Sequence, residues 1–260
     1  MKLAAILAFL VALIVPATLQ ARPVYLFGEI GKSSVLAAVD QEGDRLSGWY
    51  LYPAVGKELQ LSGQIDASGS FRLDESVDAH KTGVFEGKSA GGRWNGEWRN
   101  AAGGAPLAFS MTENREALAD ASGLFRCVVK QQKQGWTFRQ SLTLELAKGA
   151  LKALKASAAE SSAQDGEQGC FYSLEDFTPV PSDVGLVLKA KDEDQPLDAD
   201  SQRCTIQVVG DADHLLVQFG DPWETHNDCR FSGTTAFCSP RSWMTDFVVD
   251  RRTKSCKPIE

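Results

Sequence analysis

The densest group of polar functional side chains lies in the stretch DPWETHNDC, residues 221–229. Glu224, His226 and Asp228 occupy alternate positions, so on an extended strand their side chains would share one face. Such a group could hold a metal ion or transfer protons. The competing interpretation, which we favour, is a solvated loop that leads into a disulfide, with Trp223 packed beneath it. We predict that these four residues contact a partner protein.

The C-terminal stretch CSPRSWMTDFVVDRRTKSC, residues 238–256, holds two further candidates for partner contact. Arg241 and Trp243 flank an apparent turn after Pro240, and Arg and Trp dominate the binding energy of many protein interfaces. The alternative for Trp243 is a place in the hydrophobic core. We keep both residues as predicted partner contacts.

Two short motifs resemble catalytic or phosphate-binding sequences but lack the required context. Residues 87–91 (GKSAG) match G-x-S-x-G, yet that motif needs a helix after the turn, and residues 92–96 (GRWNG) predict a strand. The Gly-Lys-Ser triplets at 31–33 and 87–89 lack the earlier glycine of a phosphate-binding loop. Paired carboxylates are common in the chain and carry little weight. We therefore predict a protein that is not an enzyme and that needs no cofactor or metal.

The cysteines indicate an oxidising compartment. All six lie in the second half of the chain, their number is even, and they form no C-x-x-C pair of the kind that binds zinc. Six cysteines allow 15 pairings in three disulfides, and the sequence does not choose among them. We predict that all six are disulfide-bonded: Cys127, Cys170, Cys204, Cys229, Cys238 and Cys256.

The N-terminus is typical of a secretory signal peptide. Lys2 precedes an uncharged apolar run from Leu3 to Val15, which is too short for a membrane helix, and small residues follow up to Ala21. We expect cleavage near Ala21 and a periplasmic or secreted product without stable membrane insertion. The net charge of −7 argues against nucleic acid as a partner, because phosphate binding needs a basic surface.

The region from residue 22 to 113 predicts an antiparallel β meander. Short alternating or β-branched segments are separated by Gly-centred turns at near-regular spacing. Leu59, Leu61 and Gly63 share one face, and Trp94 and Trp98 also fall on a common face. Because so many strands must hide their edges, we expect a small barrel or sandwich. Its predicted strands are Val24–Gly28, Val35–Val39, Leu46–Tyr52, Leu59–Ile65, Ser70–Asp74, Gly83–Gly87, Arg93–Arg99 and Leu107–Thr112.

The rest of the chain predicts a connector at 114–122 and a second, disulfide-stapled β domain at 123–260. The fold class is thus mainly β, with two antiparallel β domains. Residues Ala147–Ala163 are ambiguous: their Ala, Leu and Lys content favours a helix, whereas Gly149 between two apolar runs favours a hairpin. The predicted strands are Leu124–Lys130, Thr137–Leu146, Phe171–Leu174, Gly185–Lys189, Cys204–Val209, His214–Phe219, Arg230–Phe237 and Thr245–Asp250.

The meander segments LQLSGQIDASG and GVFEGKSAGGRWNGEW, with the Cys-rich C-terminal hairpins, resemble small bacterial periplasmic inhibitor and immunity proteins. The lysozyme-inhibitor families in that group carry a Ser-Gly-x-x-Tyr loop, but here Ala236 follows Ser232-Gly233-Thr234-Thr235, so no inhibitory residue carries over. The resemblance implies a periplasmic module that binds and blocks a toxic or cell-wall-degrading enzyme. An acidic surface would steer it toward a basic exported enzyme or toxin. Two alternatives remain: an envelope structural or assembly factor, and a hydrolase that uses residues 224–228.

Overall fold

The computed structural model describes residues 23–114, 118, 120–133, 135–162, 168–174, 177–180, 182, 185–190, 205–219 and 245–259. These residues form strands and turns, which confirms the mainly β class. None of them belongs to a helix long and apolar enough to cross a membrane. The expected signal peptide and the expected strand Arg230–Phe237 lie outside the described residues.

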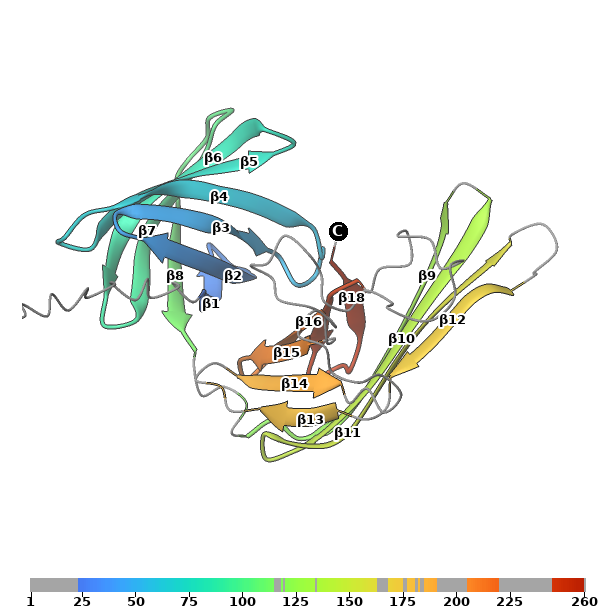
Figure 1. Ribbon diagram of the computed structural model, residues 1–260. Helices are drawn as coiled ribbons and strands as arrows, with labels where there is room; N and C mark the ends of the chain where they lie inside the picture. Colours follow the sequence, from blue (N-terminus) through green and yellow to red (C-terminus); the bar gives the residue numbers. More distant parts are fainter. Residues whose placement is uncertain are drawn as a thin grey trace, which may run out of the picture.

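The first half is a closed barrel of eight antiparallel strands in chain order, in which β1 also pairs with β8 (Figure 1). Closure removes the exposed strand edges of an open meander. Of the expected barrel or sandwich, the barrel is therefore the form adopted. Its strands are β1 Val24–Ile30, β2 Ser33–Glu42, β3 Arg45–Leu51, β4 Glu58–Ile65, β5 Ser70–Val77, β6 His80–Ala90, β7 Arg93–Asn100 and β8 Leu107–Glu113.

The barrel interior is filled by large side chains. Tyr50, Phe71, Phe85 and Phe109 form edge-on and tilted ring pairs with centroid distances of 5.3–6.1 Å. Trp94 lies 4.7 Å from Phe71, and Trp98 packs against the same cluster, as the common face predicted. This end-to-end aromatic packing makes the barrel interior a core and not a ligand cavity.

Glycines let the barrel strands bend closely past one another. A Cβ at Gly28 would overlap the carbonyl oxygen of Ser110 on β8, and one at Gly63 would overlap that of Arg72 on β5. Glycine is required at these points because no other residue leaves room for the neighbouring backbone.

The second half forms two antiparallel sheets. The four-stranded sheet has the order β12-β11-β10-β9, and the six-stranded sheet runs from β13 to β18 in chain order (Figure 1). The first contains β9 Gly123–Lys133, β10 Trp136–Ala147, β11 Ala150–Ser162 and β12 Gln168–Leu174. The second contains β13 Phe177–Val180, β14 Leu186–Ala190, β15 Thr205–Gly210, β16 His214–Phe219, β17 Phe247–Asp250 and β18 Cys256–Pro258.

Residues 147–162 adopt the hairpin alternative, and the helix alternative is wrong for them. Lys148 and Gly149 both have positive φ, 50° and 74°, as a two-residue hairpin turn with matching twist requires. Leu154 and Ala156 are buried at alternate positions of β11 opposite Leu144 and Leu142 of β10. Burial with a period of two overrides the helix propensity of Ala, Leu and Lys.

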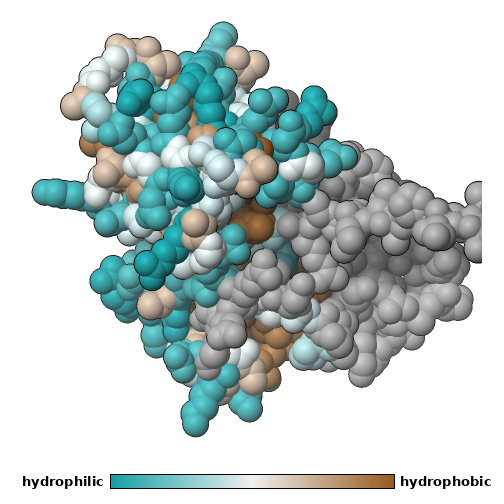
Figure 2. Space-filling model, turned by 90° about the vertical axis from the view of Figure 1, so that its left-hand side faces the viewer, coloured by the Kyte–Doolittle hydropathy of each residue, from teal (hydrophilic) through white to brown (hydrophobic). Residues whose placement is uncertain are grey.

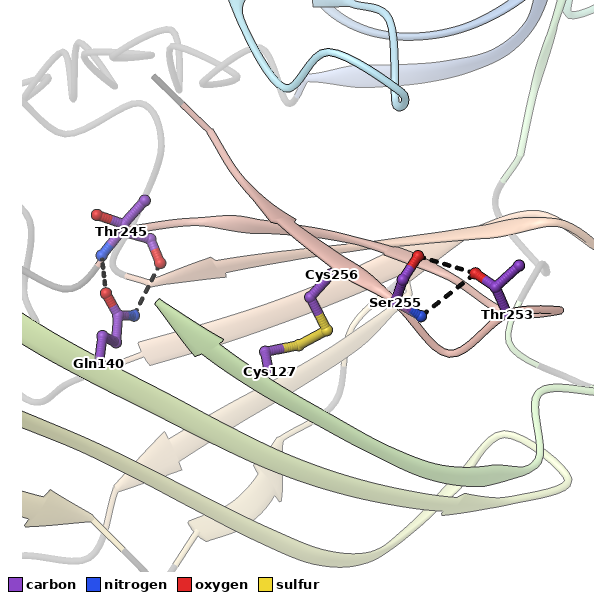
Figure 3. The surroundings of a disulfide bond; sticks show 6 residues. All are labelled: Cys127, Gln140, Thr245, Thr253, Ser255 and Cys256. Atoms are coloured by element: carbon purple, nitrogen blue, oxygen red, sulfur yellow. Dashed lines mark hydrogen bonds between the residues drawn. A yellow bond between two sulfur atoms is a disulfide. The ribbon is translucent and has the colours of Figure 1, made fainter. Parts of the chain in front are cut away.

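The two sheets share one hydrophobic core and are joined covalently. Phe125 and Leu144 of one sheet and Val217 and Phe247 of the other belong to the same buried cluster. Cys127 on β9 forms a disulfide with Cys256 on β18, with Cα atoms 5.4 Å apart (Figure 3). This confirms two of the expected disulfide cysteines. The side chains of Cys170, Cys204, Cys229 and Cys238 lie outside the described part.

A side-chain to backbone contact ties the sheets together near the disulfide. The buried Gln140 amide donates to the Thr245 carbonyl oxygen at 2.8 Å and accepts from the Thr245 N–H at 2.6 Å (Figure 3). Gln140 thereby satisfies both polar ends of its amide inside the core.

The barrel docks on the six-stranded sheet through its outer wall. Outward-facing residues of β1, β2 and β3, among them Phe27, Leu36 and Trp49, are buried against Leu216 and Val248. Tyr25 donates its hydroxyl proton toward Gln218 at 2.7 Å and lies 3.1 Å from Gln207. Alternation along antiparallel strands is typical of a sheet with one solvated face, but part of the barrel's outer side is a second core.

Candidate functional site

The predicted partner contacts Trp223, Glu224, His226, Asp228, Arg241 and Trp243 lie outside the described residues. They stay predictions.

Glu75 is the most buried carboxylate of the barrel, with 2% of its surface exposed. Its Oε2 accepts hydrogen bonds from the Tyr50 hydroxyl at 2.6 Å and the Trp98 indole at 2.7 Å, and its Oε1 accepts one from the Thr82 hydroxyl at 2.6 Å. Burial and the neighbouring Glu75 raise the pKa of Tyr50 far above its usual value. Because both carboxylate oxygens are occupied by the barrel's own donors, the cluster joins strands β3, β5, β6 and β7 and leaves no acceptor for a substrate.

Two acidic residues, Asp246 and Glu58, lie near each other at the junction between the barrel and the six-stranded sheet. Asp246, just before β17, accepts a hydrogen bond from the Phe219 N–H at 2.8 Å. Burial raises the pKa of Asp246 to about 7, and the nearby Glu58 carboxylate adds to the rise. Burial also raises the pKa of Glu58. This pair makes the junction sensitive to pH, and both residues are half-buried there.

An open polar groove of about 580 Å³ runs over the outer wall of β2–β5. Residues of these strands face outward at alternate positions, so a row of polar side chains from each strand meets in the groove. The groove is lined by Asp40, Glu42, Arg45, Leu46, Ser47, Ser62, Gly63, Gln64, Arg72 and Asp74. Figure 2 shows that the face formed by the left-hand side of Figure 1 is mainly hydrophilic in its upper part.

Asp40 carries the chemical signal in this groove. Its Oδ1 is buried and has no hydrogen-bond partner, which is uncommon for a carboxylate oxygen in a folded protein. An unpaired buried acceptor costs free energy, on the order of 1–3 kcal/mol or more for a charged group. Glu42, two residues on along the same face of β2, adds a second negative charge. A cationic donor from outside the protein would satisfy the Asp40 oxygen.

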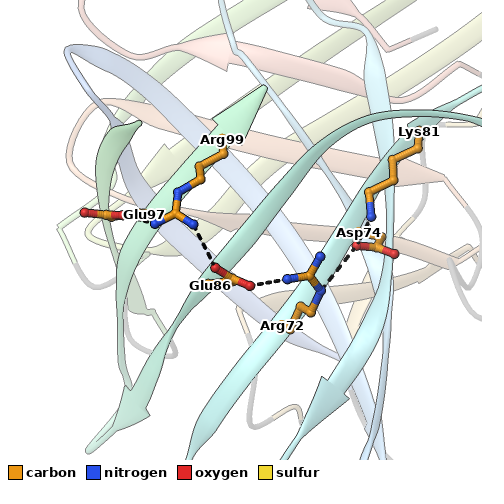
Figure 4. A network of polar contacts seen from close by, with 6 residues as sticks. All are labelled: Arg72, Asp74, Lys81, Glu86, Glu97 and Arg99. Atoms are coloured by element: carbon orange, nitrogen blue, oxygen red, sulfur yellow. Dashed lines mark hydrogen bonds and ion pairs between the residues drawn. The ribbon is translucent and has the colours of Figure 1, made fainter. Parts of the chain in front are cut away.

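The groove has two cations of its own: Arg45, which lies opposite Glu42 across β2 and β3, and Arg72, which is already engaged. Arg72 pairs with Glu86 and lies 3.8 Å from Asp74, which also binds Lys81 at 2.7 Å (Figure 4). The chain of charges continues through Arg99, whose Nη1 lies 3.3 Å from Glu86 and whose Nη2 lies 2.7 Å from Glu97. This network of exposed ion pairs occupies Arg72 at the β5 side of the groove, two strands from Asp40 on β2.

A second hollow of about 610 Å³ continues from the groove toward one end of the barrel. It shares Gln64 and Arg72 with the groove and adds Asp44 and Asp66. Hydrogen bonds from the Ser68 hydroxyl and the Ser70 N–H lower the pKa of Asp66, so its carboxylate stays charged. The two hollows together present five carboxylates and two arginines, a negative surface suited to a basic partner.

The described residues contain no group of three or more His, Cys, Asp or Glu side chains placed to hold a metal ion. No protein-family model matches the chain, and a search of curated proteins finds no match. The site is therefore defined by its geometry and charge alone: a rigid, concave, acidic wall with one unsatisfied carboxylate oxygen.

Sequence reasoning missed this groove. The alternation of Asp40 with Glu42 and of Ser62 with Gln64 places each pair on one strand face, which the sequence does show. The two faces lie next to each other because of the register of four strands and the coiling that glycines permit. Neither can be derived from one sequence.

Proposed function

We propose that this protein is an exported, non-enzymatic binding module that blocks a basic enzyme or toxin of the cell envelope, and that the β2–β5 groove receives a cationic side chain of that partner. The observation that supports the proposal best is the buried, unpaired Oδ1 of Asp40 inside an acidic groove. A partner Lys or Arg would supply the missing donor and neutralise Glu42. Charge-assisted hydrogen bonds of this kind are among the strongest in protein interfaces.

The rigidity of the scaffold supports the same function. The groove rests on a closed barrel with a packed aromatic interior, so little conformational entropy is lost when it binds. The Cys127–Cys256 disulfide supports export, because such bonds persist in oxidising compartments and are rare in the cytosol.

The test compares a double substitution in the groove with a matched one outside it. Tagged mature protein would capture partners from a periplasmic extract, and the affinity for the dominant partner would then be measured by calorimetry. Asp40→Asn with Glu42→Gln should weaken binding at least tenfold, since it removes the charges that a buried cation needs. Glu29→Gln with Asp78→Asn changes the same net charge at two exposed sites and should change affinity less than twofold.

Stability separates a binding role from a structural role for Asp40. If the carboxylate exists for a partner, Asp40→Asn should leave the free energy of unfolding unchanged or raise it, because the buried, unpaired oxygen position no longer carries part of a negative charge. A fall in stability together with unchanged binding would overturn the assignment of the groove. Binding that is insensitive to salt between 50 and 500 mM would also contradict it.

The end strands of the two sheets favour a second candidate, an assembly factor that pairs with strands of other exported proteins. Within the described part of the chain, β12 and β13 end their sheets. An edge strand offers unpaired backbone groups to another strand. This function predicts capture of many weak partners, whereas the blocking function predicts a single dominant enzyme.

A further inference from the structure

The four-stranded sheet differs in charge from the rest of the protein. Residues 123–162, which form β9–β11, hold seven Lys or Arg and two acidic residues, although the whole chain has 27 basic and 34 acidic residues. This region is basic although the protein as a whole is acidic, and that difference needs a physical explanation. The explanation must lie on the face of this sheet that does not pack against the shared core.

Strand register defines that outer face. Side chains of Cys127, Leu142 and Ala156 point into the shared core, so the residues between them point outward. The outer residues form rows across the three strands: Leu124, Glu145 and Ala153; Arg126, Thr143 and Lys155; Val128, Ser141 and Ser157; Lys130, Arg139 and Ala159; Gln132, Thr137 and Ser161. We call this surface the basic face.

Two of the five rows carry the cations. Arg126 and Lys155 flank Thr143 in one row, and Lys130 lies directly opposite Arg139 in another, with all four residues exposed. Successive rows on one face are roughly 7 Å apart, so the two cationic rows are roughly 14 Å apart. The row between them is small and polar, with the Ser141 and Ser157 hydroxyls 2.6 Å apart.

The Lys130–Arg139 pair is unfavourable for the isolated protein. Like charges directly opposite each other on a sheet are destabilising. Within the described residues, no ion pair relieves Arg126, Lys130 or Arg139. Glu145 belongs to the row next to that of Thr143, at the end of the face away from Lys130 and Arg139. It is the single carboxylate in the rows defined above. A bound anion would remove the repulsion.

We propose that the basic face binds an acidic polysaccharide, with the two cationic rows contacting successive charged sugars and the serine row contacting hydroxyl groups between them. Charge complementarity and the hydroxyl groups between the two cationic rows favour this occupant. A lipid surface fits less well, since Leu124 and Val128 are the only large apolar residues of the rows. Single-stranded nucleic acid also fits less well, because these rows contain no aromatic side chain on which a base could stack.

The binding test uses the full mature chain and defined polymers. Polygalacturonate and dextran sulfate serve as acidic probes, with uncharged dextran as the control, and affinity is measured by calorimetry at 50 mM salt. We expect binding to both acidic polymers, none to dextran, and strong weakening at 500 mM salt. Absence of binding to both acidic polymers would overturn the proposal.

Matched variants locate the surface. Lys130→Gln with Arg139→Gln should weaken polymer binding at least tenfold. Lys32→Gln with Arg93→Gln removes one exposed Lys and one exposed Arg from the barrel and should change it less than twofold. The first variant relieves like-charge repulsion, so its fold should persist, as circular dichroism and the melting temperature would show. Arg126→Gln with Lys155→Gln tests the other row independently and should also weaken binding.

Two further probes decide the class of ligand. Vesicles of phosphatidylglycerol and a single-stranded DNA oligomer should bind more weakly than polygalacturonate. If either binds more tightly and is lost in the Lys130→Gln/Arg139→Gln variant, the polysaccharide proposal is wrong. Equal losses in the basic-face and barrel variants would show general charge attraction and would overturn it as well.

Discussion

Removing the Cys127–Cys256 disulfide should cost this protein a large part of its stability. The two cysteines are 129 residues apart in the chain, so the bond closes a long loop in the unfolded state. The chain-entropy relation gives about 5 kcal/mol for a loop of this length, and measured effects are commonly smaller. Replacing both cysteines by alanine should therefore lower the free energy of unfolding by about 3–5 kcal/mol.

The location of the bond strengthens this expectation. Cys127 is 1% exposed within the core that the two sheets share, and β18, which holds Cys256, is only three residues long. A strand this short has few backbone hydrogen bonds to hold it in place. Without the disulfide, β18 should detach before the rest of the sheet unfolds, and hydrogen exchange should show reduced protection of Lys257 and Val248, which pair across β17 and β18.

The assay is urea unfolding of the oxidised protein, followed by tryptophan fluorescence and far-UV circular dichroism. Cys127→Ala with Cys256→Ala is compared with wild type without reductant, so that any bonds among the other four cysteines stay intact. The single Cys256→Ala variant separates loss of the crosslink from loss of core volume at Cys127. A double variant within 1 kcal/mol of wild type would refute the reasoning, as would a free thiol at Cys127 in the native oxidised protein.

Three further perturbations test the fold. Glu75→Leu should lower the free energy of unfolding by about 3–5 kcal/mol in denaturant titration, because three donors inside the barrel lose their acceptor. Glu75→Gln should cost much less, because its single amide oxygen can still accept from Tyr50 and Trp98 while its NH2 group donates to the Thr82 hydroxyl. Trp49→Ala should lower the free energy of unfolding by about 3–5 kcal/mol and expose the barrel junction to limited proteolysis. An unchanged digest would contradict the packed core between the barrel and the six-stranded sheet. The pKa of Asp246 is raised to about 7, so its folded form binds a proton more tightly, and stability should fall as pH rises from 5 to 8. Because Asp246 is partly exposed, we expect it to change the free energy of unfolding by about 2 kcal/mol over this pH range. The measurement is the part of the pH dependence of stability that Asp246→Asn removes.

The barrel strands could be predicted because each one carries its own signal. The expected segment Leu59–Ile65 matches β4 to within one residue, and Trp94 and Trp98 share the interior as their spacing predicted. Gly149 indicated the β10–β11 hairpin for the same local reason. Such features need only neighbouring residues, and alternation with a period of two reports burial on one face.

Contacts between distant segments could not be predicted from the chain. The pairing of Cys127 with Cys256 requires β18 to lie beside β9, and one sequence offers 15 pairings of equal standing. The barrel junction left a clue that alternation alone does not capture: Val35–Val39 is apolar at every position, and all five residues are buried. A continuous apolar run indicates burial on both faces. This is the reason β2 belongs both to the barrel interior and to the junction.

The two charged surfaces are held by one continuous set of packed residues. The barrel interior adjoins the junction through β1–β3, the junction adjoins the shared core through the six-stranded sheet, and the disulfide joins that sheet to β9. A close-packed core transmits little movement unless an element has two discrete arrangements. Occupation of the basic face should therefore leave the groove's affinity for its partner unchanged, so the two binding events add without coupling. A protein built in this way would bind an anionic polymer through one surface. Its other surface would then be available to a basic enzyme that is attracted to the same polymer.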